Sequence, residues 1–244
     1  MSSVSPATVS ELAPTGKLRI GLNYSNFLLV LKDAPDGTPQ GIAPDIGREL
    51  ASRLGVKPDY VRFDTAGKLA DGVKKGMWDV AFLGNEPQRA SEIAFTPAYL
   101  QIPVTYLVPA GSALKTFADV DRQGVRISVA DQSAYHLFLT RNLKAAELVS
   151  ADGIEGSYKM FVELKLEALA GLKPRLITDA EKLPGSRIIK GQLTAVQQSI
   201  GTPKSRETGA RYLKEFVESL KSAGFVGEAI SRHKVNGVSV APKA

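Results

Sequence analysis

The chain has 244 residues, of which 43% are hydrophobic and 23% are charged, and its net charge is +6 at pH 7. This length predicts one or two domains, and the composition is typical of an ordinary globular protein. The sequence holds no cysteine and only two histidines, which excludes a disulfide framework, a thiolate metal site and a multi-histidine metal centre. We therefore expect no metal and no other cofactor.

Short β-type runs alternate with amphipathic helical runs along the chain, a pattern that predicts an α/β fold. In the first part of the chain the apolar spacing predicts strands at 18–22, 60–63, 80–83 and 104–108, and helices at 41–54 and 68–75. The run at 80–83 (VAFL) is apolar throughout, as expected of a strand that is buried on both faces.

A turn-rich joint at 109–124 precedes a second series of elements. The predicted strands of this series are 125–129, 175–178, 188–189 and 193–200, and the predicted helices are 133–143, 159–170, 207–220 and 226–232. The restart of the pattern near residue 110 indicates two α/β units. The last two helices are too few to form a third unit, so we expect them to dock on one of the first two.

Five segments, taken in order, resemble the bacterial extracellular solute-binding proteins of family 3, the polar amino-acid type that serves ABC importers. They are LRIGLNYSNF, GIAPDIGRELASRLGV, KKGMWDVAFLGNEPQRASEIAFTPAY, ADVDRQGVRISVADQSAY and TAVQQSIGTPKS. The resemblance implies a two-lobed, type II periplasmic-binding-protein-like α/β fold with two hinge crossings. Lobe 1 would be 1–107 plus 199–244 and lobe 2 would be 108–198, with the ligand held in the cleft as the lobes close.

Arg89 stands where the resemblance implies an arginine that holds the ligand's α-carboxylate. A guanidinium is a planar fork that pairs with a carboxylate through two hydrogen bonds. The alternative is a surface arginine paired with Glu86 or Glu92. The family's loop reads G-x-T-x-T-x-E-R, whereas this chain has the shorter GNEPQR, so Asn85 and Glu86 replace a threonine that would help to hold the carboxylate. A carboxylate at Glu86 favours an amine on the ligand.

Ser133 is expected to open the helix that follows the strand at 125–129. Free backbone N–H groups at a helix start attract a carboxylate or phosphate. Together with Asp131 and Gln132, Ser133 therefore forms a candidate ligand-binding turn, where the family usually has a glycine before the serine or threonine. The alternative for Ser133 is that it serves only as a helix cap.

Asp179 follows the predicted strand at 175–178, where the resemblance implies an aspartate that binds the ligand's α-ammonium. The alternative is that Asp179 caps a short following helix. At the end of the first strand, Asn23 is a candidate polar contact. Tyr24 and Phe27 are candidates for an apolar wall against the ligand side chain, and core packing in lobe 1 is the alternative for Phe27.

The remaining aromatic and histidine residues carry weaker signals. Trp78 is expected in the core, His136 on a helix surface or at the cleft edge, and His233 in solvent. Tyr106 and the Gln197–Gln198 pair lie on the expected crossings, where they are candidates to line the back of the cleft.

The resemblance implies a solute-binding protein that holds a small polar, amino-acid-like ligand for an ABC permease and does no chemistry on it. We expect a monomer that binds no nucleic acid, because the basic residues are scattered among acidic ones. The family implies a periplasmic location. The first 16 residues have neither the basic nor the apolar region of a secretory signal, which leaves a cytoplasmic location open.

Two other classes of function remain open at this stage. The first is an enzyme on the same fold, such as a dehydratase that acts on prephenate or arogenate and needs a general acid. Glu86, Glu163 and Glu167 are the candidates for that acid. The second is a cytoplasmic ligand-sensing protein, against which stands the lack of any DNA-binding or kinase segment.

Overall fold

The computed structural model describes residues 4–244, which fold into two compact units. Unit 1 comprises Met1–Gln101, Gln197–Val235 and Ser239–Ala244, and unit 2 comprises Ile102–Val196 and Asn236–Val238. The first two passages between the units occur inside the long strands β5 (Leu100–Val108) and β10 (Thr194–Pro203).

The first boundary falls earlier in β5 than the expected position after residue 107. The reason is that β5 pairs with a unit 2 strand from Val104 to Leu107, so most of β5 is part of the unit 2 sheet. The second boundary lies after Val196, close to the expected position after residue 198.

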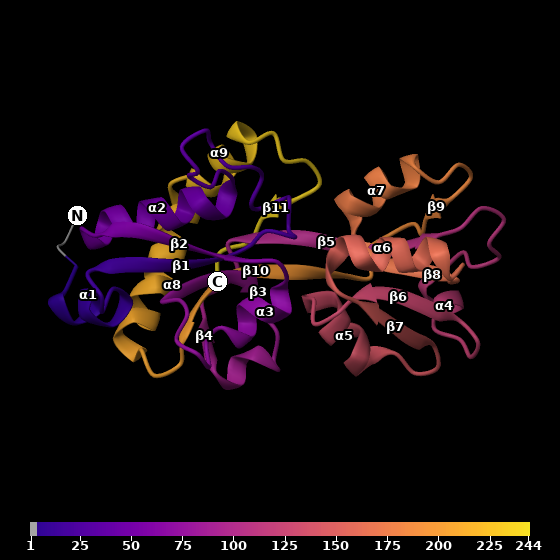
Figure 1. Ribbon diagram of the computed structural model, residues 1–244, viewed down its shortest axis with the longest axis horizontal. Helices are drawn as coiled ribbons and strands as arrows, with labels where there is room; N and C mark the ends of the chain where they lie inside the picture. Colours follow the sequence, from indigo (N-terminus) through magenta and orange to yellow (C-terminus); the bar gives the residue numbers. More distant parts are fainter. Residues whose placement is uncertain (1–3) are drawn as a thin grey trace. The chain divides into compact units, whose positions relative to one another are not determined.

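Unit 1 is built on a sheet with the strand order β2-β1-β3-β10 (Figure 1). Strand β1 pairs in parallel with β2 and β3, whereas β10 runs antiparallel to β3 and also pairs with β4. The elements of unit 1, besides its parts of β5 and β10, are α1 (Pro6–Leu12), β1 (Lys17–Asn23), α2 (Ile42–Leu54), β2 (Lys57–Phe63), α3 (Ala66–Asp71), β3 (Val80–Gly84), the 3-10 helix η1 (Arg89–Ser91), β4 (Ile93–Phe95), α8 (Glu207–Ser222), α9 (Phe225–Arg232) and β11 (Ser239–Val240).

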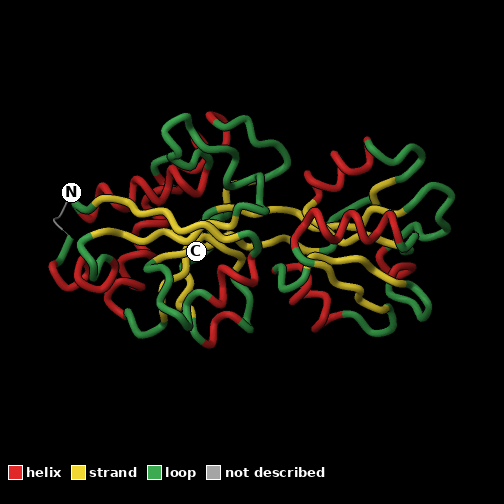
Figure 2. The backbone as a smooth tube through the Cα atoms, viewed as in Figure 1, coloured by secondary structure: helices red, strands yellow, loops and turns green. Residues whose placement is uncertain are grey.

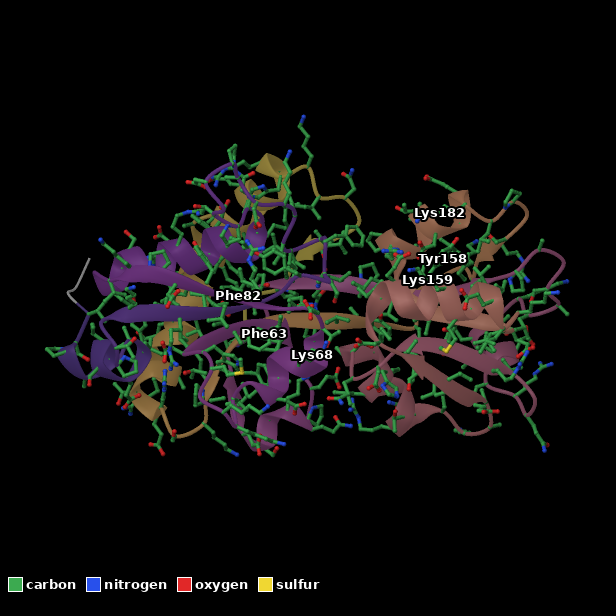
Figure 3. All side chains as sticks on the ribbon, viewed as in Figure 1. Phe63, Lys68, Phe82, Tyr158, Lys159 and Lys182 are labelled. Atoms are coloured by element: carbon green, nitrogen blue, oxygen red, sulfur yellow. The ribbon has the colours of Figure 1, made fainter. Side chains whose placement is uncertain are left out.

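Helices cover both faces of the unit 1 sheet (Figure 1). Helix α2 approaches one face closely at Gly47, where an added Cβ would lie 3.0 Å from the Ile20 side chain and 3.5 Å from Phe82. On the other face, Trp78 and Leu69 form a buried cluster with Phe63, and Trp78 Nε1 donates a 2.8 Å hydrogen bond to the Leu69 carbonyl. The expected burial of Trp78 is confirmed, and Phe82 and Phe63 can be found in Figure 3.

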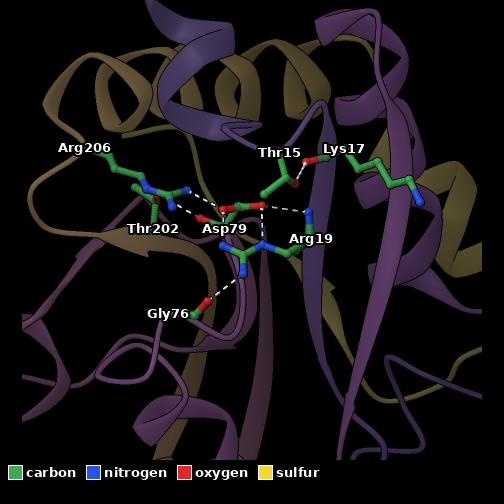
Figure 4. A network of polar contacts seen from close by, with 7 residues as sticks. All are labelled: Thr15, Lys17, Arg19, Gly76, Asp79, Thr202 and Arg206. Carbon is green, nitrogen blue, oxygen red and sulfur yellow. Dashed lines mark hydrogen bonds and ion pairs between the residues drawn. The ribbon is translucent and has the colours of Figure 1, made fainter.

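A buried aspartate connects three elements of unit 1 (Figure 4). Asp79 has no exposed surface and lies directly before β3. It accepts hydrogen bonds from the Arg19 backbone at 2.9 Å, from Arg19 Nη2 at 2.8 Å and from Arg206 Nη1 at 2.8 Å. Thr202 Oγ1 donates a 2.9 Å hydrogen bond to the Asp79 carbonyl. The Asp79 carboxylate thus joins β1 to the start of α8, and the backbone carbonyl of the same residue joins the end of β10.

In the sheet of unit 2, which shares one continuous strand order with the strands of unit 1, β8 and β7 flank β6 in parallel, while β5 pairs antiparallel with β8 and β9. Helices flank this sheet, as the red segments beside the yellow strands of Figure 2 show. The elements of unit 2 are α4 (Phe117–Val120), β6 (Arg126–Ala130), α5 (Ala134–Asn142), β7 (Glu147–Ala151), α6 (Gly153–Glu163), β8 (Ala168–Leu172), α7 (Lys173–Glu181) and β9 (Arg187–Ile188).

Two predictions in unit 2 are wrong. The helix expected at 159–170 ends at Glu163, and residues 168–172 form the buried strand β8. Alanine and leucine favour helices, but between β5 and β6 this short ALAGL segment completes a sheet, so tertiary pairing overrides propensity. The strand expected at 175–178 is helix α7, which starts with Pro174 in its first turn.

The other predicted elements are present, with ends that shift by a few residues. Helix α2 stops at Gly55, whose φ of +68° gives the left-handed cap that the glycine predicts. Helix α3 is shorter than the expected 68–75. Strands β4, β7 and β11 and helices α1 and α4 were not predicted.

Candidate functional site

Polar side chains gather at one edge of the unit 1 sheet. Strands β1 and β3 are parallel, so their carboxyl ends, at Asn23 and Gly84, lie at the same edge. The Asn85 N–H donates a 2.8 Å hydrogen bond to the Gln197 carbonyl, which brings β10 to this edge as well. Carboxyl ends of parallel strands are where open α/β sheets bind ligands. We call this set of residues (Asn23, Asn85, Glu86, Arg89, Gln197 and Gln198) the unit 1 edge.

Arg89 is buried at this edge, with 7% of its surface exposed, and belongs to η1. Its Nη1 donates a 2.7 Å hydrogen bond to the carbonyl of Gly84, the last residue of β3. Burial lowers the pKa of the guanidinium to about 10, and the charge of nearby Glu86 acts in the opposite direction. Arg89 therefore stays charged at neutral pH. Glu86 is 9% exposed. Of the two acidic residues that the sequence offers as partners, Glu86 and Glu92, it is Glu86 whose charge raises the pKa of Arg89.

The polar candidates at the end of β1, Asn23 and Tyr24, already make contacts with other residues of the protein. Tyr24 donates a 3.1 Å hydrogen bond to Asp33 Oδ1, and the Arg62 guanidinium lies 4.6 Å from the centre of the Tyr24 ring. Burial, followed by the hydrogen bond to Asp33, raises the pKa of the Tyr24 hydroxyl to about 12. Asn23 Oδ1 accepts hydrogen bonds from the backbone and hydroxyl of Ser25. Phe27 is half-buried. One ring face of Tyr24 is thus already covered by a cation.

In unit 2 the segment Asp131–Ser133, here the DQS turn, links β6 to α5. The Ser133 side chain caps α5 by accepting the His136 N–H at 3.1 Å, as the sequence predicted. Gln132 has a φ of +49°, a conformation that few residues other than glycine adopt. The Gln132 N–H donates a 2.9 Å hydrogen bond to His136 Nδ1. The imidazole therefore holds the turn in this strained shape, a role that sequence reasoning missed.

The same hydrogen bond sets the charge of His136. Asp131 Oδ1 lies 3.3 Å from His136 Nδ1, which would suit an ion pair if this nitrogen carried a proton. A protonated Nδ1 cannot accept the Gln132 N–H, so the geometry selects the neutral ring with its proton on Nε2. Burial lowers the His136 pKa, and the Asp131 charge opposes this effect.

We expect His136 to titrate below its ordinary pKa of about 6.5 and to be the Nε2–H tautomer at pH 7. Below about pH 6.5 the unfolded chain then binds more protons at His136 than the folded chain does. The neutral imidazole therefore makes its full contribution to the free energy of unfolding above about pH 6.5. This contribution is lost as the pH falls towards the pKa of His136 in the folded protein. A ¹H–¹⁵N NMR titration measures both the pKa and the tautomer, with His136→Gln to assign the signal. A pKa above 6.5, or a protonated Nδ1, would contradict the expectation.

Asp179 does not follow a strand, because the preceding strand β8 ends at Leu172 and Asp179 lies in the last turns of α7. It is 1% exposed, and both of its carboxylate oxygens accept from Arg175 Nε, at 2.8 and 2.9 Å. Arg175 also reaches Glu155, while Lys182 lies 5.2 Å from the centre of the Tyr158 ring, as the labels in Figure 3 help to locate. The placement expected for Asp179 is therefore wrong, and its carboxylate joins a network between α6 and α7.

The candidate general acids of the enzyme alternative differ in their surroundings. Glu167 accepts hydrogen bonds from the backbone and side chain of Arg126 in β6, and these lower the pKa of its carboxyl. A general acid at neutral pH needs the opposite shift. Glu163 is exposed at the end of α6, which leaves the buried Glu86 as the acidic group at the unit 1 edge.

The remaining sequence candidates are buried or bonded. Tyr106 is 1% exposed and packs against Phe117 with ring centres 6.1 Å apart. His233, expected in solvent, has its Nε2 2.8 Å from Asp45 Oδ2, so that expectation is wrong. Among residues 4–244 no group of three or more potential metal ligands gathers, and no helix of this part of the chain is long and apolar enough to cross a membrane.

Two α/β units connected through the long strands β5 and β10 are typical of the type II periplasmic-binding-protein-like fold. The model of the bacterial extracellular solute-binding proteins, family 3, matches residues 18–233. The chain belongs to this family, and the resemblance drawn from its ordered motifs is confirmed. No curated protein matches its sequence.

Solved structures share the fold at low sequence identity. The solute receptor for L-cysteine of Neisseria gonorrhoeae has a TM-score of 0.79 at 19% identity, covering 94% of this chain and 95% of its own. An amino acid ABC transporter substrate-binding protein of Streptococcus pneumoniae bound to L-arginine has a TM-score of 0.74 at 16% identity, covering 96% and 99%. An ancestral amino acid-binding protein, a precursor of cyclohexadienyl dehydratase, has a TM-score of 0.75 at 18% identity, covering 92% and 98%.

Proposed function

We propose that this protein is the solute-binding component of an ABC-type importer and that it binds a free amino acid. The observation that carries the proposal is the buried, charged Arg89 at the carboxyl edge of the unit 1 sheet, on the loop directly after β3. A guanidinium in such a low-dielectric place pairs strongly with a carboxylate, and open α/β sheets bind ligands at this edge.

In this proposal Arg89 holds the ligand's α-carboxylate. The DQS turn of unit 2 is by itself a second candidate binding element, because the first N–H groups of α5 and the Ser133 cap favour a polar or anionic group. Glu86, buried at the unit 1 edge, is the acidic group we assign to the α-ammonium. Asp179 is left out, since both of its oxygens already bond to Arg175.

The proposal is supported by the structural neighbours, which include a solute receptor for L-cysteine, an amino acid substrate-binding protein bound to L-arginine and an ancestral arginine-binding protein bound to glutamine. A periplasmic location and delivery of the ligand to a membrane permease are part of it. The same neighbours include the precursor of a dehydratase, so prephenate belongs in any ligand screen.

A thermal-shift screen followed by calorimetry tests the proposal. The probes are L-arginine, L-glutamine, L-cysteine, the other proteinogenic amino acids and prephenate. A ligand that binds only the folded state adds about 2.7 kcal/mol of stability at a hundredfold excess over its Kd. We expect at least one amino acid to raise the melting temperature and to be recovered unchanged. Turnover of prephenate, or no amino acid that binds, would overturn the proposal.

A further inference from the structure

One buried carboxamide oxygen at the unit 1 edge has no hydrogen-bond partner in the described part of the chain. Gln198 is 5% exposed, its Oε1 is enclosed by protein, and nothing in the described part of the chain donates a hydrogen bond to it. Leaving a buried acceptor unpaired costs folding free energy, and native proteins keep few such groups. An unpaired amide at the edge of a candidate site therefore points to a partner that is not part of the chain.

The position of Gln198 links it to the loop that carries Arg89. In the antiparallel pair of β10 and β3, Gln198 lies directly opposite Gly84. The Gln198 side chain therefore projects from the sheet face on which Gly84 leaves space, because glycine has no side chain. One residue further along each strand, the Asn85 N–H donates a 2.8 Å hydrogen bond to the Gln197 carbonyl. Gly84 also offers its carbonyl to Arg89 Nη1. The carboxamide thus lies beside the strand end where the carboxylate-binding group is anchored.

Other amides at this edge are used by the protein itself. Gln197 Oε1 accepts a 3.0 Å hydrogen bond from Gln101 Nε2, and Asn23 Oδ1 accepts from Ser25. Ser199, the next residue along β10, also has a buried hydroxyl without a described partner, but it pairs with Leu83 and so faces the opposite side of the sheet. Ser199 is therefore a matched control for Gln198.

We propose that Gln198 is a ligand-binding residue whose carboxamide oxygen accepts a hydrogen bond from an N–H group on the ligand's side chain. This proposal rests on the proposed function. A neutral oxygen is a good acceptor for the N–H of an amide or a guanidinium, whereas a compact ammonium in a buried place needs a carboxylate, such as Glu86. The ligand class is accordingly an amino acid with an amide or guanidinium side chain.

The variant Gln198→Met tests the proposal, because methionine has a similar length and no strong hydrogen-bonding group. In the ligand-free protein we expect a higher melting temperature than in the wild type, since the unpaired amide is gone. Calorimetry with L-glutamine and L-arginine is expected to show at least a tenfold weaker affinity for the one that the wild type binds. If the ligand is L-glutamine, its preference over the isosteric L-glutamate should also disappear. Ser199→Ala should bind like the wild type.

The outcomes separate this inference from the function on which it rests. Wild-type binding of an amino acid such as L-cysteine, but of none with an amide or guanidinium side chain (L-glutamine, L-asparagine and L-arginine), keeps the proposed function and overturns the role of Gln198. Unchanged affinity in Gln198→Met does the same, and so does a lower melting temperature, which would mean that the amide has a structural partner such as a bound water. A wild type that binds no amino acid overturns both.

Discussion

Replacing Asp79 with alanine is expected to lower the free energy of unfolding of unit 1 by about 3–5 kcal/mol, as removal of one partner from a buried ion pair does. Asp79 is fully buried and accepts from Arg19 and Arg206 at 2.8 Å and from the Arg19 backbone at 2.9 Å. Without it, two guanidiniums with 25% and 17% exposure lose their shared counter-charge, and a backbone N–H loses its acceptor.

Urea unfolding followed by fluorescence measures this loss, because Trp78 is the chain's single tryptophan and lies in unit 1. Asp59→Ala is the matched control. Asp59 is an exposed carboxylate whose charge also acts on Arg19, and removing it should cost under about 0.5 kcal/mol. An Asp79→Ala protein within about 1 kcal/mol of the wild type would show that solvent replaces the hydrogen bonds of the Asp79 carboxylate.

The Arg89→Ala variant is expected to lose about 2–5 kcal/mol of ligand binding, a roughly 30- to 5,000-fold rise in Kd for the amino acid found in the screen. The physical reason is that the ligand's carboxylate would enter a buried site that no longer holds a matching charge. Arg89→Lys should recover only part of the affinity, because an ammonium keeps the charge and loses the two-pronged geometry.

Calorimetry with the wild type's own ligand gives the affinities, and Trp78 fluorescence checks that each variant is folded. Arg53→Ala is the control, since Arg53 also belongs to unit 1 but bonds to Glu49 in α2 and to Ser219 in α8. Wild-type affinity in a folded Arg89→Ala protein would remove the carboxylate role. The role of the arginine would then be structural, as in its hydrogen bond to the backbone carbonyl of Gly84.

Much of the fold could be predicted because its signals are local. The apolar spacing at 42–54 and the glycine after it give a helix and its end, and the all-apolar run at 80–83 gives a buried strand. The predictions failed where local preference and tertiary pairing disagree. The ALAGL segment reads as helical but lies between β5 and β6, and RLIT reads as a strand but follows Pro174, which starts α7.

The candidate site was predicted less completely than the fold. Ser133 as the first-turn cap follows from its place after a strand, and the structure confirms the cap. The roles of the residues around Ser133 do not follow from their order along the chain. His136 could be placed near the turn but not identified as the acceptor of the Gln132 N–H, because this depends on the left-handed backbone of Gln132.

The sequence by itself determined the α/β class, the family, the position of Arg89 after a buried strand and the cap at Ser133, since each depends on order and spacing along the chain. Only the tertiary structure decided the partners. Asp79 meets Arg206 across 127 residues, and His233 meets Asp45 across 188. Gln198 lies beside Gly84 only through strand pairing. Local patterns report on residues within a few turns, whereas burial and charge pairing depend on contacts between distant segments that only the folded chain makes.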